Sequence, residues 1–252
     1  MSVYLDAHCH LGDFLDPLAT LAEAPGTVVV AVTELPSRYR LLTSRFRADR
    51  RVRVALGLHP LRASTAGPLE EGQLTRLLED AEYVGEVGLD FSAQGRESRS
   101  AQRRVFDRLL GAPEIRKKVI TVHSRSAETT VIRCLREVGV AAILHWYSGP
   151  PALVDEALDA GLYFSLNARM LTTKKGRLTA SALPADRVLT ESDGPYGGLR
   201  RRDSRPADIP GLITELARLW KIDPQDARGV VYKNMATLHA RTVGGAGPGE
   251  QA

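Results

Sequence analysis

Eight short runs of apolar residues, rich in β-branched side chains, recur along this chain of 252 residues. The segments between the runs carry apolar residues at helical spacing, as at Leu74, Leu77 and Leu78. Strands that alternate with helices in this way predict parallel βαβ units. The predicted strands are Val3–Leu5, Thr27–Val32, Val52–Leu56, Tyr83–Val87, Val119–Val122, Ala142–Leu144, Leu162–Leu166 and Arg187–Thr190.

Eight such units, each of roughly 20–30 residues, predict an α/β fold and, within that class, a single TIM-type (β/α)8 barrel. A doubly wound open sheet is the alternative, although such sheets normally have fewer strands. Two further helical patterns, Ile209–Trp220 and Asp226–Leu238, predict extra C-terminal helices on the outside of the barrel. We expect residues 1–241 to form one domain and the Gly-rich residues 242–252 to form a disordered tail.

Charge and cysteine content narrow the choice of partner and compartment. The formal net charge is +4, which is compatible with a polyanionic partner. Cys9 and Cys134 are the two cysteines, and their positions do not suggest a disulfide framework. The first residues lack a signal-peptide pattern, and no apolar run reaches the length of about 20 residues that crosses a membrane. We therefore expect a cytoplasmic protein without a membrane partner.

Polar side chains gather where the predicted strands end. His8 and His10, two positions apart at the end of the first strand, share one face. In a barrel, the carboxyl ends of the strands converge on one opening, here called the mouth, where active sites lie. Five of the six histidines and two carboxylates fall at such ends: His8, His10, His59, Glu86, His123, His145 and Asp193.

This set of side chains predicts a metal centre. Four histidines and two carboxylates suffice for two divalent metal ions that share a bridging carboxylate. Imidazole ligands suit Zn, Mn, Fe or Ni, whereas carboxylates and waters suit Mg or Mn. A pair of such ions can activate water and stabilise both ends of an in-line displacement at phosphorus.

Six motifs in this order resemble the TatD family of metal-dependent deoxyribonucleases, from about Tyr4 to Leu238. They are H-x-H at 8–10, G-L-H-P at 57–60, G-E-V-G-L-D at 85–90, H-S-R at 123–125, H-W-Y-S-G at 145–149 and E-S-D-G-P at 191–195. The resemblance implies a (β/α)8 barrel that hydrolyses phosphodiester bonds of DNA with two divalent metal ions, Mg, Mn or Zn.

The resemblance also implies roles for single residues. One metal would be held by His8, His10, Glu86 and Asp193, and the other by Glu86, His123 and His145. His59 and Arg125 would bind the substrate phosphate. We interpret Glu86 as the bridging carboxylate and Asp193, which does not bridge, as the proton acceptor. Asp6, Asp90 and Glu191 are predicted to support the ligands through hydrogen bonds.

The chain departs from the usual family pattern at three places, which are Trp146-Tyr147, Phe91-Ser92-Ala93 and Gly194-Pro195-Tyr196. These features resemble the TatD-like nuclease of the Qat phage-defence system. We therefore expect a 3′–5′ exonuclease acting on single-stranded DNA or frayed ends, in antiviral defence and with defence-system protein partners. Trp146 or Tyr147 either stacks on a base or packs in the barrel, and the run Arg200–Arg202 is expected to contact phosphates.

Two other functions fit the same barrel. One is a small-molecule hydrolase acting on an ester, lactone or amide, since a barrel does not fix the substrate. Amidohydrolases whose metals are bridged by a carboxylated lysine need that lysine at a strand end, whereas Lys117 and Lys118 precede the fifth strand. The other is a subunit of a defence complex whose hydrolase activity requires a partner.

Overall fold

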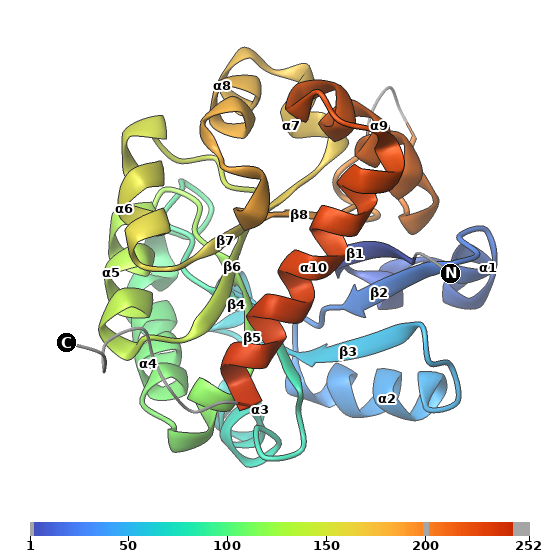
Figure 1. Ribbon diagram of the computed structural model, residues 1–252. Coiled ribbons are helices and arrows are strands. Elements are labelled where there is room, and N and C mark those ends of the chain that lie inside the picture. Colours follow the sequence, from blue (N-terminus) through green and yellow to red (C-terminus); the bar gives the residue numbers. More distant parts are fainter. Residues whose placement is uncertain (1–2, 199–201, 244–252) are drawn as a thin grey trace.

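Eight parallel strands, consecutive in the sheet as they are in the sequence, form the centre of the molecule (Figure 1). The computed structural model describes residues 3–198 and 202–243. All eight predicted strands are present, with ends that shift by a few residues. They are β1 (Tyr4–Cys9), β2 (Thr27–Ala31), β3 (Val52–Leu56), β4 (Tyr83–Gly88), β5 (Val119–His123), β6 (Ala141–His145), β7 (Tyr163–Leu166) and β8 (Val188–Thr190).

The first and last strands meet, so the sheet curls into a nearly closed barrel. Asp6 Oδ1 in β1 accepts a hydrogen bond of 2.9 Å from the backbone N–H of Ser192, just after β8. The backbone N–H of Asp193 donates to the carbonyl of His8 at 2.9 Å. An open doubly wound sheet would leave these two strands at opposite edges. The barrel prediction is therefore confirmed, and the open-sheet alternative is wrong.

Amphipathic helices return the chain between strands, which makes each strand parallel to the one before. In α5, Val131, Ile132 and Leu135 are fully buried against the sheet, which places the main apolar core between the helices and the strands. Across the described residues, no helix combines the length and apolar character needed to span a membrane. The α-helices are α1 (Pro17–Ala22), α2 (Pro36–Phe46), α3 (Gly67–Arg76), α4 (Arg99–Leu110), α5 (Glu128–Val138), α6 (Val154–Asp159), α7 (Ala168–Thr172), α8 (Lys174–Ala182), α9 (Ile209–Trp220) and α10 (Pro224–Val243).

The helix α10 lies across the end of the barrel opposite the mouth (Figure 1). Asn234 Nδ2 donates to the carbonyls of Ala185 and Val188, both at 2.8 Å, where β8 begins. Arg241 Nη1 donates to the carbonyl of Gly161, just before β7, at 2.7 Å. The prediction that this helix covers the outside of the barrel is therefore wrong for α10, whereas α9 packs beside β1 and β8.

The position of α10 follows from its apolar face. Ala227, Val231 and Leu238 recur at helical spacing and are buried. The helix includes residues 242 and 243 of the predicted tail, and residues 244–252 lie outside the described residues.

Replacing Asn234 with alanine should loosen α10. The substitution leaves two backbone carbonyls without their donor, and an unsatisfied buried polar group costs about 1–3 kcal/mol. We expect Asn234→Ala to lower the free energy of unfolding in urea by about 2 kcal/mol. The neighbouring exposed Lys233→Ala should change it by less than about 0.5 kcal/mol. Equal effects of the two substitutions would show that these hydrogen bonds do not hold the helix.

Candidate metal centre

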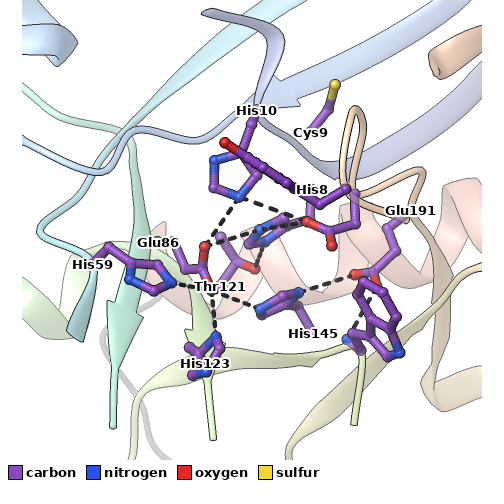
Figure 2. A network of polar contacts seen from close by, with 12 residues as sticks. His8, Cys9, His10, His59, Glu86, Thr121, His123, His145 and Glu191 are labelled. Atoms are coloured by element: carbon purple, nitrogen blue, oxygen red, sulfur yellow. Dashed lines mark hydrogen bonds and ion pairs between the residues drawn. The ribbon is translucent and has the colours of Figure 1, made fainter. Parts of the chain in front are cut away.

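The polar residues predicted at strand ends come together at the mouth of the barrel (Figure 2). His123 and His145 are the last residues of β5 and β6. The structure corrects the placement of His8, which lies within β1 rather than after it, and confirms that Glu86 lies in β4. The strand β1 continues past Leu5 because its later residues still pair with β2.

The carboxylate of Glu86 occupies the middle of the group and is 2% exposed. Its Oε1 lies 2.7 Å from His123 Nδ1 and 2.8 Å from His145 Nε2. His59 Nε2 is 3.4 Å from the same oxygen. One oxygen of Glu86 therefore faces the histidine that follows β3 and the histidines that end β5 and β6.

The second oxygen of Glu86 faces the histidines of the first strand. Its Oε2 lies 3.1 Å from His10 Nε2 and 3.6 Å from His8 Nε2. Asp193 Oδ1 is 3.6 Å and 3.7 Å from the same two nitrogens. Ligand atoms of His8, His10 and Asp193 all lie within 4.8 Å of one another, which is close enough for one cation. Glu86 thus stands between two groups of donors, as a bridging carboxylate would.

The His8 ring shows that these residues fit a metal ion. Its Nδ1 lies 2.7 Å from Thr121 Oγ1, and its Nε2 is buried without a hydrogen-bond partner. Burial lowers the pKa of His8 well below its usual value, so the ring is neutral and Nε2 can offer a lone pair. A fixed hydrogen bond at one ring nitrogen and an open position at the other are typical of metal-ligating histidines. The mixture of imidazoles and carboxylates suits divalent ions.

His59 differs from the other histidines in its hydrogen bonding. Its Nδ1 accepts the backbone N–H of Leu61 at 3.2 Å, so Nε2 carries the proton. His59 is spaced like a ligand with Glu86 and His123, but a protonated Nε2 is a donor and offers no lone pair to a cation. This geometry suits the phosphate-binding role that the sequence predicts for His59.

Two supporting residues fix the ligand rings. Asp90 Oδ2 lies 3.0 Å from His123 Nε2 and so turns His123 Nδ1 towards Glu86. The hydrogen bonds from His123 and Ser92 outweigh burial and lower the pKa of Asp90 to about 2. Thr121, which orients His8, was not predicted. It lies two positions before His123 on the same face of β5, so the alternation along this strand could have identified it.

Glu191 holds residues at the ends of β6 and β7 through hydrogen bonds and a close approach to His145. Its carboxylate accepts hydrogen bonds from Asn167 Nδ2 at 2.9 Å and from the backbone N–H of Trp146 at 3.1 Å. Glu191 Oε2 also lies 3.7 Å from His145 Nδ1. By contrast, Asp6 accepts hydrogen bonds from backbone N–H groups, at Ser192 and more weakly at His8.

Two glycines of the sequence motifs allow the close approach of neighbouring backbones. A Cβ at Gly57 would lie 1.9 Å from the carbonyl oxygen of Thr33 and 2.5 Å from the nitrogen of Glu86. At Gly88, where φ is +131°, a Cβ would lie 2.1 Å from the carbonyl oxygen of His123. Any side chain at these positions would displace Glu86 or His123.

A cavity of about 640 Å³ opens over the centre. Of the two neighbouring aromatic residues, Trp146 lines this cavity, whereas Tyr147 is buried and its hydroxyl donates to the carbonyl of Pro150. Tyr196, which was not predicted as a site residue, also lines it and packs edge-on against His10. The other lining residues include Glu34, Leu61, Gln94, Arg125, Ser148 and Arg169.

The predicted arginine run does not lie free at the mouth in the part that is described. Arg202 pairs with Asp208 at 2.7 Å, which neutralises its charge locally. Arg200 and Arg201 lie outside the described residues.

Charges in the centre are strongly coupled. Burial would lower the pKa of His10, but Glu86 and Asp193 outweigh it and raise the pKa to about 9. Burial would also lower the pKa of His123, but Asp90 and Glu86 raise it to about 9. Burial raises the pKa of Asp193 to about 7. In the metal-free protein, therefore, the positive charges of His10 and His123 offset the negative charges of Glu86 and Asp90.

Comparisons with known proteins identify relatives of this chain. The sequence model of one protein family, described as TatD related DNase, matches residues 5–240. The chain is 30% identical to the uncharacterized metal-dependent hydrolase TatD of Mycobacterium tuberculosis, over 91% of this chain and 95% of that protein. It is 29% identical to the deoxyribonuclease TATDN3 of Homo sapiens, over 93% of each chain. The crystal structure of YJJV, a TatD homologue from Escherichia coli, has the same fold, with a TM-score of 0.84 at 22% identity, over 93% of this chain and 97% of that one.

Metal binding should release protons. His10 and His123 are protonated below pH 9 and must lose their protons to coordinate a cation. Full loading at pH 7.5 should therefore release about two protons, and affinity should rise with pH and level off above about 9. Calorimetric titration in two buffers of different protonation enthalpy measures this number. Release of no protons between pH 7 and 8 would contradict the arrangement around Glu86.

Proposed function

Because the chain belongs to the TatD-related DNase family of metal-dependent hydrolases, we propose that it cleaves phosphodiester bonds of DNA with two divalent metal ions, Mg²⁺, Mn²⁺ or Zn²⁺. The observation that carries this proposal is the position of Glu86, whose two oxygens face separate groups of donors. Two cations held about 3.5–4 Å apart, as a shared carboxylate allows, can stabilise both the attacking and the leaving oxygen of an in-line displacement at phosphorus.

The proposed metal ligands fall into two groups, one facing each oxygen of Glu86. His8, His10 and Asp193 would hold one ion together with Glu86 Oε2, and His123 and His145 would hold the other together with Glu86 Oε1. These residues supply imidazole and carboxylate donors to both ions and leave the cavity side open for substrate.

The phosphate of the substrate would meet two donors on the cavity wall. His59 presents its Nε2–H towards the centre, and a phosphate oxygen can accept this hydrogen bond. Arg125 lines the same cavity, and a guanidinium binds phosphate through two parallel N–H groups. Together these residues fix the phosphorus atom in front of the centre.

Asp193 is the proposed proton acceptor. When bound, divalent ions supply an activated water molecule and offset the charge that develops on the phosphate. Asp193 would take the proton of the attacking water, since Glu86 is occupied on both of its oxygens. A carboxylate held beside the attacking water is a suitable proton acceptor.

The proposal extends to the direction of cleavage, the form of DNA and the biological role. We propose removal of nucleotides in the 3′–5′ direction from single-stranded DNA or frayed ends, in antiviral defence and with protein partners of such a system. The polarity and the defence role come from the resemblance carried by the Trp146-Tyr147, Phe91-Ser92-Ala93 and Gly194-Pro195-Tyr196 segments. End-labelled substrates test the polarity, and size-exclusion chromatography with the products of neighbouring genes tests the partnership.

A small-molecule hydrolase on the same barrel is the weaker alternative. In the described residues, Glu86 takes the central position that a carboxylated lysine occupies in many amidohydrolases. Lys118 lies instead at the opposite end of the barrel, where its Nζ donates to the carbonyl of Glu79. A panel of small esters cleaved faster than DNA would favour this alternative.

Removal of metal should abolish DNA cleavage. We expect metal-stripped protein to be inactive on end-labelled single-stranded DNA, and Mg²⁺, Mn²⁺ or Zn²⁺ to restore cleavage. His123→Ala should stay inactive after metal addition, because it removes a ligand and the partner of Glu86 Oε1. Cleavage that survives metal removal would contradict the proposed function.

Replacement of Asp193 by asparagine should stop turnover while the fold persists. The amide cannot accept a proton, and loss of a general base typically costs about 10²–10⁴-fold in rate. Cleavage assays measure the rate, and thermal unfolding followed by circular dichroism checks the fold. A rate near that of the wild type would show that another group accepts the proton.

A further inference from the structure

We propose that Trp146 and Arg169 form a base-binding shelf for the nucleotide next to the cleaved phosphate. This inference rests on the proposed function and deepens it, because it names the group that distinguishes an unpaired strand from a duplex. The shelf is defined as the indole of Trp146 with the guanidinium of Arg169 beside it.

The backbone at Trp146 is held in an unusual conformation. Its φ is +37°, which bulky residues rarely adopt. Glu191 accepts the backbone N–H of Trp146 at 3.1 Å and stabilises the turn directly after His145. The side chain lines the cavity and is only partly buried. Backbone strain of this kind persists where the surroundings enforce it and is concentrated at functional sites.

Arg169 completes the shelf from the next sector of the barrel. Its Cζ lies 6.0 Å from the centre of the Trp146 ring, and its Nη1 donates to the carbonyl of Gly198 at 3.2 Å. Arg169 is exposed and lines the same cavity. Aromatic side chains joined by arginine form the platforms on which single-stranded nucleic acids stack their bases.

Cations on the opposite side of the mouth are already neutralised. After β2 and β3, Arg38 pairs with Asp13 at 2.6 Å and Arg62 pairs with Glu34 at 2.9 Å. These four groups cancel in pairs, so this side attracts a polyanion weakly.

The side next to the shelf keeps its positive charge. Within the described part of the chain, neither Arg125 nor Arg169 has a carboxylate partner. Arg125 follows β5 and Trp146 follows β6, so the two residues lie in adjacent sectors of the mouth. A strand whose phosphate meets Arg125 would therefore place its neighbouring base over Trp146.

The shelf selects unpaired bases. A base can stack on the indole only after it leaves its own duplex stack, which costs least at single strands and frayed ends. The cavity of about 640 Å³ is also in the range that encloses a small ligand. Stacking at this position would thus favour single-stranded DNA without any contact that reads the sequence.

A fluorescence titration tests the shelf without changing it. Trp146 and Trp220 are the two tryptophans, and Trp220 lies in α9, so Trp220→Phe leaves Trp146 as the reporter. We expect a short single-stranded oligonucleotide, added in EDTA, to quench this fluorescence. The same oligonucleotide with abasic residues should bind, as shown by anisotropy of a labelled copy, without quenching.

Cleavage kinetics give a second readout in the metal-loaded enzyme. Trp146→Ala should raise the KM for single-stranded DNA about 10-fold with little change in kcat, and Trp146→Phe should restore most of the loss. Arg169→Ala should raise the KM less, and the exposed Arg133→Ala on α5 serves as the matched control. An abasic substrate at the stacked position should be insensitive to Trp146→Ala.

The outcomes separate the two levels of inference. Binding of DNA without quenching, or equal loss of native and abasic cleavage in Trp146→Ala, would overturn the shelf and leave the nuclease standing. Failure of the metal-loaded enzyme to bind or cleave any oligonucleotide would refute the proposed function and the shelf together.

Discussion

A single buried carboxylate, that of Glu86, is the interaction on which the mouth of the barrel depends. Burial of an isolated charge is costly, and here imidazoles from four strands offset the cost. The histidines lower the pKa of Glu86 although burial alone would raise it. A closed barrel brings side chains at the ends of β1, β3, β5 and β6 to one point, so the centre depends on the fold.

Much of this arrangement could be predicted from the sequence. The spacing of apolar residues distinguishes strands from helices, and the order of strands and helices indicates a parallel barrel. Alternating apolar runs predicted all eight strands, and the convergence of strand ends predicted that His8, His123 and His145 would meet Glu86. The roles of these residues in metal binding remain predictions. The prediction works because a parallel barrel converts positions far apart in sequence into neighbours by topology alone.

The remaining features depend on packing and local hydrogen bonds that no sequence pattern reports. Whether Trp146 or Tyr147 faces the cavity depends on the positive φ at Trp146 and on its bond to Glu191. The donor character of His59 depends on the backbone N–H of Leu61. The pairing of Arg202 with Asp208 could not be read from a run of like charges.

The position of α10 has a consequence for how the protein is made. This helix covers the starts of the strands, yet it follows all eight of them in the sequence. A nascent chain therefore completes all eight strands before α10, which covers the end of the barrel opposite the mouth, has been synthesised. Until then, the apolar surface that Ala227, Val231 and Leu238 later cover is open to water, and such intermediates aggregate readily. The end of the barrel opposite the mouth is thus closed by a segment that is made after all eight strands and lies far from the metal centre.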